Sequence, residues 1–105
     1  MHKIVTNECF GGFGLSAIAI GEWERSTGLE WDAYDVARHD PTLVAIVERL
    51  GSQANDDSSH LVVHEVNAPR YYIEEYDGME TIITPTVLET MWVYPSTNTT
   101  QQSTE

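Results

Sequence analysis

Residues 40 to 51 carry the clearest structural signal in the sequence, and they predict one helix. Asp40 is a favoured N-cap residue, and Pro41 is a favoured first residue of a helix. Apolar side chains then recur with the spacing of one helical face, and Gly51 provides a stop: Leu43, Ile46, Val47 and Leu50. Any fold for this chain must therefore bury one face of a helix at this point.

The first 28 residues predict a strand followed by a second helix. Residues 4 to 10 are rich in β-branched and aromatic side chains, and Gly11 and Gly12 end this run. Ser16 is a plausible N-cap for a helix from Ala17 to about Thr27. Gly28 follows as a stop signal.

Residues 29 to 36 alternate apolar and acidic side chains, which predicts a strand with one buried face and one acidic face. A strand, a helix of about a dozen residues and a second strand make the spacing of a βαβ unit, which is compatible with parallel pairing. Residues 60–66 and 71–76 predict two more strands, and Asp77–Gly78 predicts a hairpin turn into a strand over 79–83. Residues 85–94 fit either a strand or a short helix.

This order of elements, β-α-β-α-β-β-β, predicts the α+β class: a small mixed β-sheet with two helices packed on one face. The chain has 105 residues, which is enough for one domain. We expect that domain to cover residues 1–94. Residues 95–105 are dominated by Ser, Thr and Gln, and we expect a disordered polar tail there.

The charge of the chain restricts its partners. Five basic and 17 acidic side chains give a net charge of −12. Such a surface repels phosphate backbones and anionic lipid, so we expect no direct nucleic-acid binding and no membrane binding. No apolar run approaches the roughly 20 residues of a membrane helix, and the first residues lack the apolar stretch of a signal peptide, so we expect an intracellular protein. The acidity is compatible with solubility, with dimerisation and with mimicry of a nucleic acid.

The glycine-rich segment between the first strand and the first helix is the main candidate binding site. Free backbone N–H groups and the positive end of a helix dipole meet there, and this geometry suits a phosphate or a carboxylate. The segment matches neither G-x-x-x-x-G-K-[ST] nor G-x-G-x-x-G. The alternative is that the glycines allow the helix to pack closely on the sheet. The candidate contacts in this segment are Phe10, Gly11, Gly12, Phe13, Gly14 and Ser16.

A few side chains near turns could assist such a site. Arg38, His39 and Arg70 could supply positive charge, because a guanidinium matches a phosphate with two hydrogen bonds. Tyr71 or Tyr72 could stack on a base. The alternative is that each arginine pairs with one of the many carboxylates.

Metal and catalytic sites find little support in the sequence. His60 and His64 would lie about 13 Å apart along a strand, which is too far to share a metal, so we expect no metal site and no cofactor. Cys9 is expected to be a small buried core thiol. A small hydrolase would need a carboxylate cluster that the sequence does not bring together, so we expect no enzymatic activity.

The segment Asn-Glu-Cys-Phe-Gly-Gly-Phe-Gly-Leu-Ser at residues 7–16 resembles the opening of a widespread family of small uncharacterised bacteriophage and prophage proteins. The resemblance covers roughly residues 3 to 83, and it continues through residues 38–41, 50–51, 54–55, 61–63 and 76–80. Family members tend to carry a basic and aromatic stretch after the Asp-Gly-x-Glu turn. This chain has Thr84 to Glu89 there instead, which departs from the family pattern.

The resemblance implies a viral protein that acts in the host cytoplasm, and small phage domains of this kind are often anti-defence proteins. In size and architecture the chain is similar to the Thoeris anti-defence proteins. The leading hypothesis is therefore immune evasion by a homo-oligomeric sponge, which binds a nucleotide-derived host signal, a cyclic ADP-ribose or a cyclic oligonucleotide, without turnover. The alternative is an acidic interaction protein that imitates DNA and blocks a host DNA-binding defence protein.

Overall fold

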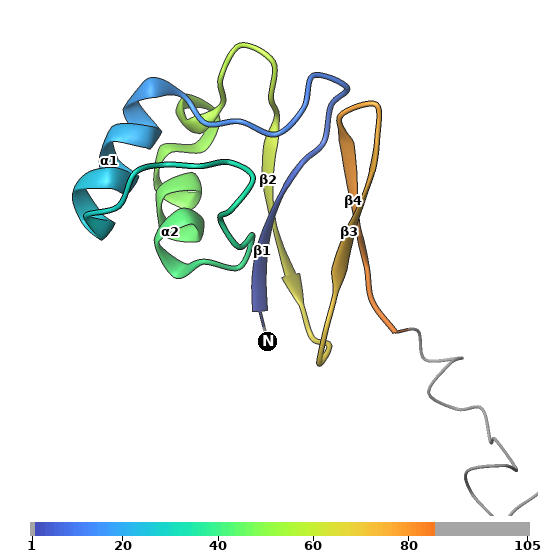
Figure 1. Cartoon of the computed structure of the whole chain (residues 1–105). Helices are drawn as coiled ribbons and strands as arrows, with labels where there is room; N and C mark the ends of the chain where they lie inside the picture. Colours follow the sequence, from blue (N-terminus) through green and yellow to red (C-terminus); the bar gives the residue numbers. More distant parts are fainter. Residues whose placement is uncertain (1, 86–105) are drawn as a thin grey trace, which may run out of the picture.

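A computed structural model of the chain describes residues 2–85 (Figure 1). The strand predicted over 85–94, or the helix in its place, and the predicted tail over 95–105 lie outside the described residues, apart from Pro85. The elements occur in the following order: β1 (His2–Asn7), α1 (Ala17–Thr27), α2 (Pro41–Leu50), the 3-10 helix η1 (Gly51–Ala54), β2 (Leu61–Val66), β3 (Tyr72–Tyr76) and β4 (Met79–Ile83). The α+β class predicted from the sequence is confirmed.

The sheet differs in detail from the prediction. β1 pairs with β2, and β3 pairs with β4, in both cases antiparallel, so the described chain holds two two-stranded sheets in place of one mixed sheet. The parallel pairing that the βαβ spacing allowed is absent. The partner of β1 is instead β2, whose first residue, Leu61, lies 54 positions after Asn7, the last residue of β1. Figure 1 shows α1 and α2 on one side of the β1–β2 pair and the β3–β4 hairpin on the other.

The strand predicted over residues 29–36 is wrong, because this segment forms turns. The Asp32 carbonyl accepts hydrogen bonds from the N–H groups of Asp35 and Val36, and the Asp32 side chain accepts one from the Tyr34 N–H at 2.9 Å. An aspartate side chain that bonds to nearby backbone favours a turn over a strand. The alternation of acidic and apolar residues therefore reflects capped turns, which periodicity alone does not distinguish from a strand.

Both helices follow their local signals. Ser16 accepts a hydrogen bond from the Ala19 N–H at the start of α1, and Gly28 ends the helix in the left-handed conformation, with a φ of 72°. Asp40 caps α2, with its side chain accepting from the Leu43 N–H at 2.9 Å. The predicted helix bounds are confirmed because caps and stops act over a few residues.

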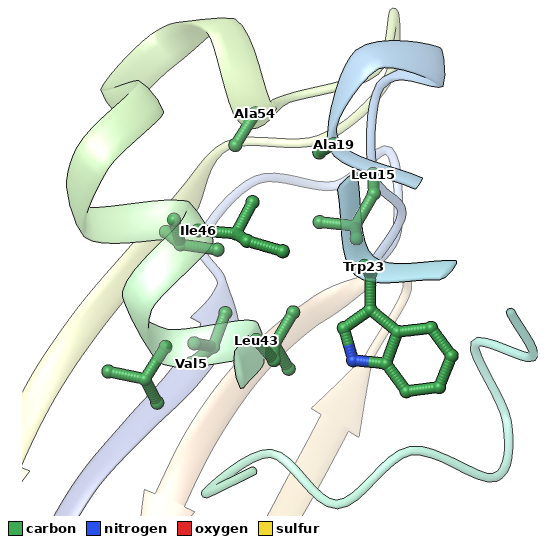
Figure 2. Close-up of a cluster of buried hydrophobic side chains, with 9 residues drawn as sticks. Val5, Leu15, Ala19, Trp23, Leu43, Ile46 and Ala54 are labelled. Atoms are coloured by element: carbon green, nitrogen blue, oxygen red, sulfur yellow. The ribbon is translucent and has the colours of Figure 1, made fainter. Parts of the chain in front are cut away.

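The core lies between the two helices and the face of β1 that carries Val5 (Figure 2). It contains nine buried side chains: Val5, Leu15, Ala19, Trp23, Leu43, Val44, Ile46, Val47 and Ala54. The Trp23 ring packs edge-on against the Trp31 ring, with 5.2 Å between the ring centroids. The indole N–H of Trp23 donates to the Asp40 carboxylate. Asp40 therefore joins α1 to α2 as well as capping α2.

No helix within residues 2–85 is long and apolar enough to cross a bilayer.

The double role of Asp40 gives a stability test. Replacing Asp40 with alanine removes both the cap of α2 and the acceptor for Trp23, and we expect a loss of about 1–3 kcal/mol in the free energy of unfolding. Asp40→Asn keeps an oxygen that can accept both bonds and should cost clearly less. Urea unfolding followed by circular dichroism measures both variants. Equal losses for the two would show that these hydrogen bonds do not stabilise the fold.

Candidate functional site

The glycine-rich segment does not act as one loop, because its glycines meet different surroundings. A Cβ on Gly11 would lie 1.8 Å from the Ser58 carbonyl oxygen, and one on Gly14 would lie 2.1 Å from the Asp56 carboxylate. Gly11 requires glycine because the backbone of Ser58 packs directly on it, whereas the atom close to Gly14 belongs to the side chain of Asp56. Gly12 has a φ of 99° and nothing within 4 Å of a built Cβ, so it is required for its backbone conformation instead.

The start of α1 is occupied by the chain itself. The Ser16 N–H donates to the Ala54 carbonyl at 2.8 Å, and the Ser16 hydroxyl donates to the Gln53 carbonyl at 2.7 Å. The Asp56 carboxylate lies beside Gly14. The predicted contacts at Gly14 and Ser16 are therefore contacts within the protein, which supports the interpretation of close packing at this end of the segment.

The other end of the segment lines a cleft of about 520 Å³. Gly11, Gly12 and Phe13 form one wall. The remaining lining comes from the 29–36 turns, from Arg38 and from the β3–β4 hairpin: Ala33, Tyr34, Arg38, Glu75, Gly78 and Glu80. Tyr34 is fully exposed at this site. Of the predicted site residues, the structure thus brings Gly11, Gly12, Phe13 and Arg38 together.

An ion pair between Arg38 and Glu80 crosses the cleft. Both guanidinium Nη atoms contact the carboxylate, with Nη2 at 2.8 Å from Oε2, and the side chain of Glu80 is only 6% exposed. The guanidinium also lies over the Phe13 ring, 3.6 Å from its centroid, which is a cation–π contact. Its positive charge is therefore already balanced by a carboxylate and its face is covered by a ring.

The charge of the cleft follows from these side chains. Arg38 contributes one positive charge, whereas Glu75 and Glu80 contribute two negative charges. Glu75 is exposed, and its carboxylate also accepts a hydrogen bond from the Gly78 N–H in the hairpin turn. The site as a whole is thus net negative, and it favours a positively charged group over a phosphate.

Asn7 holds the segments next to the cleft together through hydrogen bonds. Its amide nitrogen donates to the carbonyl oxygens of Gly78 and Cys9 at 2.7 Å each, and its amide oxygen accepts from the His60 N–H at 2.7 Å. The Asn7 backbone N–H donates to Glu80. One fully buried side chain thereby ties β1 to the hairpin turn and to the start of β2.

The other predicted contacts lie elsewhere. His39 Nδ1 and the Tyr71 hydroxyl are 2.6 Å apart, so these two residues form a pair of their own outside the cleft. Arg70 and Tyr71 line a separate hollow of about 170 Å³ with Pro85. Phe10 is 61% exposed and does not line the cleft. The predicted grouping of all these residues around one ligand is not present.

Cys9 is half-buried and lies outside the core cluster, where its thiol donates to the Ser58 carbonyl at 3.0 Å. The prediction of a core thiol is therefore wrong, because the chain leaves the sheet after Asn7. His64 pairs with Glu8, at 2.5 Å between Nε2 and Oε2. Among residues 2–85, no three His, Cys, Asp or Glu side chains are arranged to hold a metal ion.

Sequence reasoning missed three important side chains of the cleft: Tyr34, Glu75 and Glu80. Tyr34 lies in the segment predicted as a strand, and Glu75 and Glu80 lie in the predicted hairpin without a predicted contact. The hairpin signal at Asp77–Gly78 could have placed Glu75 opposite Glu80, since a two-residue turn fixes the register. It contains no information about the contact of Glu80 with Arg38, which lies 42 residues away.

Comparisons with protein-family models, with curated proteins and with solved structures give no match for this chain.

The Arg38–Glu80 pair should matter for stability. Arg38→Met leaves the Glu80 carboxylate buried without its partner, and we expect a loss of about 3–5 kcal/mol in the free energy of unfolding. Arg49→Met breaks the exposed pair with Glu22 and should cost no more than about 1 kcal/mol. Chemical denaturation of both variants tests the difference. A loss for Arg38→Met as small as that for Arg49→Met would contradict this account.

Tyr71 should titrate at higher pH than an ordinary tyrosine. Burial raises its pKa above the usual 10.0, although the Arg38 charge and a hydrogen bond with the backbone of His39 act in the opposite direction. Because the folded protein favours the neutral phenol, the resulting stability is present below pH 10 and is lost as the pH rises through the raised pKa. Urea unfolding between pH 9 and 11 should therefore show a steeper loss for the natural protein than for Tyr71→Phe. Parallel pH profiles for the two would refute the shift.

Proposed function

We propose that the protein is an acidic interaction protein, without catalytic activity, that blocks a basic host DNA-binding protein. The observation that carries the proposal is the pairing of its few positive charges with carboxylates of the same chain. Lys3 pairs with Glu48, Arg38 with Glu80 and Arg49 with Glu22, so three of the five basic side chains are bound to carboxylates. The remaining exterior is strongly negative.

The cleft supports this proposal because it is suited to a basic side chain. Glu75 offers an exposed carboxylate, and Tyr34 offers a fully exposed aromatic ring on the same lining. A lysine or arginine head group gains from both, since cations bind to carboxylates and to the faces of tyrosine rings. Arg38 does not repel it, because Glu80 balances the guanidinium charge.

A second acidic hollow lies beside the 29–36 turns. It has a volume of about 360 Å³, and Glu30, Asp32 and Asp35 line it together with Trp23 and Leu29. The turns that replace the predicted strand therefore present carboxylates at one hollow and Tyr34 at another. A basic surface of a partner could contact both, and the attraction would weaken as salt increases.

The resemblance to phage proteins supports a role in anti-defence within the host cytoplasm, where the blocked protein would be a DNA-binding component of immunity. This assignment of the partner rests on the resemblance.

An arginine nonapeptide is the probe for the charge and ring chemistry of the cleft. We expect binding by calorimetry at 50 mM NaCl that weakens strongly at 200 mM NaCl. Glu75→Gln should weaken binding about threefold to fivefold, as expected for one exposed charge pair. Glu65→Gln removes one exposed charge outside the cleft and should change the affinity less than twofold. Absence of peptide binding at low salt, or equal effects of the two variants, would exclude this use of the cleft.

Sequestration of a nucleotide-derived signal by a homo-oligomer is the second candidate. The cleft volume lies within the range of small-molecule sites, and Gly11, Gly12 and Phe13 line the cleft beside Arg38. The base would stack on Tyr34, and its phosphates would have to displace Glu80 from Arg38. Calorimetry with cyclic ADP-ribose isomers and cyclic oligonucleotides distinguishes the candidates, because saturable heat lost in Tyr34→Ala would favour the sponge.

A further inference from the structure

The outer edge of β3 pairs with no other strand of the described chain. β4 packs between β3 and β1, and no other helix or strand of residues 2–85 contacts β3. Figure 1 shows the hairpin on the side of the molecule away from the helices. An edge strand of this kind presents unpaired backbone N–H and C=O groups, which can bind a further strand.

The hairpin register identifies the free groups. Asp77 and Gly78 have φ values of 54° and 93° and form a two-residue turn that pairs Tyr76 with Met79. The backbone groups of Tyr76, and of every second residue before it, therefore bond to β4. Those of Ile73 and Glu75 point away from β4, toward the open edge.

The side chains along this edge determine which strand could bind there. Tyr72, Glu74 and Tyr76 alternate along one face of β3, and the two tyrosines are 60% and 77% exposed. Glu75 lies on the opposite face, where it lines the cleft. Both faces of the edge thus carry a carboxylate, and one face also carries two aromatic rings.

We propose that the edge of β3 binds an extended, lysine- or arginine-bearing segment of the partner by strand addition. The partner backbone would pair with Ile73 and Glu75. A basic side chain directly opposite Glu74 would meet its carboxylate, with the rings of Tyr72 and Tyr76 on either side. The inference rests on the proposed function and specifies how part of the basic partner is bound.

A second copy of this chain does not suit the edge. Antiparallel pairing of two β3 strands about their central residue would place Glu74 opposite Glu74, and like charges directly opposite each other destabilise a sheet. Each copy also carries a net charge of −12. Charge complementarity therefore selects a basic segment.

The test uses the full chain and a heptapeptide that alternates arginine and valine. Ile73→Pro removes one outward N–H, and proline is tolerated on an edge strand. Ile73→Val keeps that N–H and is the matched control, and Ile73 does not line the cleft. We expect Ile73→Pro to weaken peptide binding about fivefold to tenfold relative to Ile73→Val. Glu74→Gln should weaken it about threefold.

A second measurement tests strand addition even if the Ile73→Pro variant does not fold. The same heptapeptide, N-methylated at each valine, cannot donate hydrogen bonds to the edge while an arginine lies opposite Glu74, and it should bind the natural protein at least fivefold more weakly. Amide exchange at Ile73 and Glu75 should slow on addition of the unmodified peptide. Equal binding of both peptides with unchanged exchange would overturn strand addition. If Glu75→Gln still weakened peptide binding in that case, the proposed function would stand. If neither the arginine nonapeptide nor the heptapeptide bound, both the proposed function and strand addition would be overturned.

Discussion

The ion pair between Arg38 and Glu80 joins the segment before α2 to the β3–β4 hairpin, 42 residues away, at the edge of β1. β1 is buried from Ile4 to Asn7 but pairs with only one strand, so the backbone groups on its other edge need partners away from water. The Val5 N–H donates to the Arg38 carbonyl at 2.9 Å, and the Asn7 N–H donates to the Glu80 carboxylate at 2.8 Å. The pair thus completes the hydrogen bonding of β1 where a neighbouring strand would normally do so, and it brings the β3–β4 hairpin to the sheet.

The pairing of Arg38 with Glu80 also determines the charge of the neighbouring cleft. A guanidinium with free donors beside Gly12 and Phe13 would form a phosphate site, but here its donors face Glu80 and its face covers Phe13. Other basic side chains are also paired with carboxylates. Together with Arg38, Lys3 and Arg49 form such pairs, which accounts for three of the five basic side chains. The exterior of the described chain is therefore dominated by carboxylates.

The glycine segment serves the fold and the site at different residues. Gly11 and Gly14 allow residues 56–58 to pack against the loop, while Gly12 turns the chain toward the cleft. Gly78 has a similar role from the hairpin, since a Cβ there would lie 2.5 Å from the Phe10 carbonyl oxygen. The loop and the hairpin turn meet through backbone, and Asn7 bonds to both ends of this contact.

The elements that the sequence predicts correctly are those whose signals are local. The caps at Ser16 and Asp40 and the Asp77–Gly78 turn act over two to four residues, so both helices and the hairpin were predicted at their observed places. The turns at 29–36 were mistaken for a strand because their apolar and acidic residues alternate as in a strand. Three other features depend on how the whole chain folds. They are the antiparallel partner of β1, the contact of Arg38 with Glu80, and the separation of His39 and Tyr71 from the cleft. These contacts join residues 32 to 64 positions apart, and their geometry follows from the packing of the whole chain rather than from any local pattern.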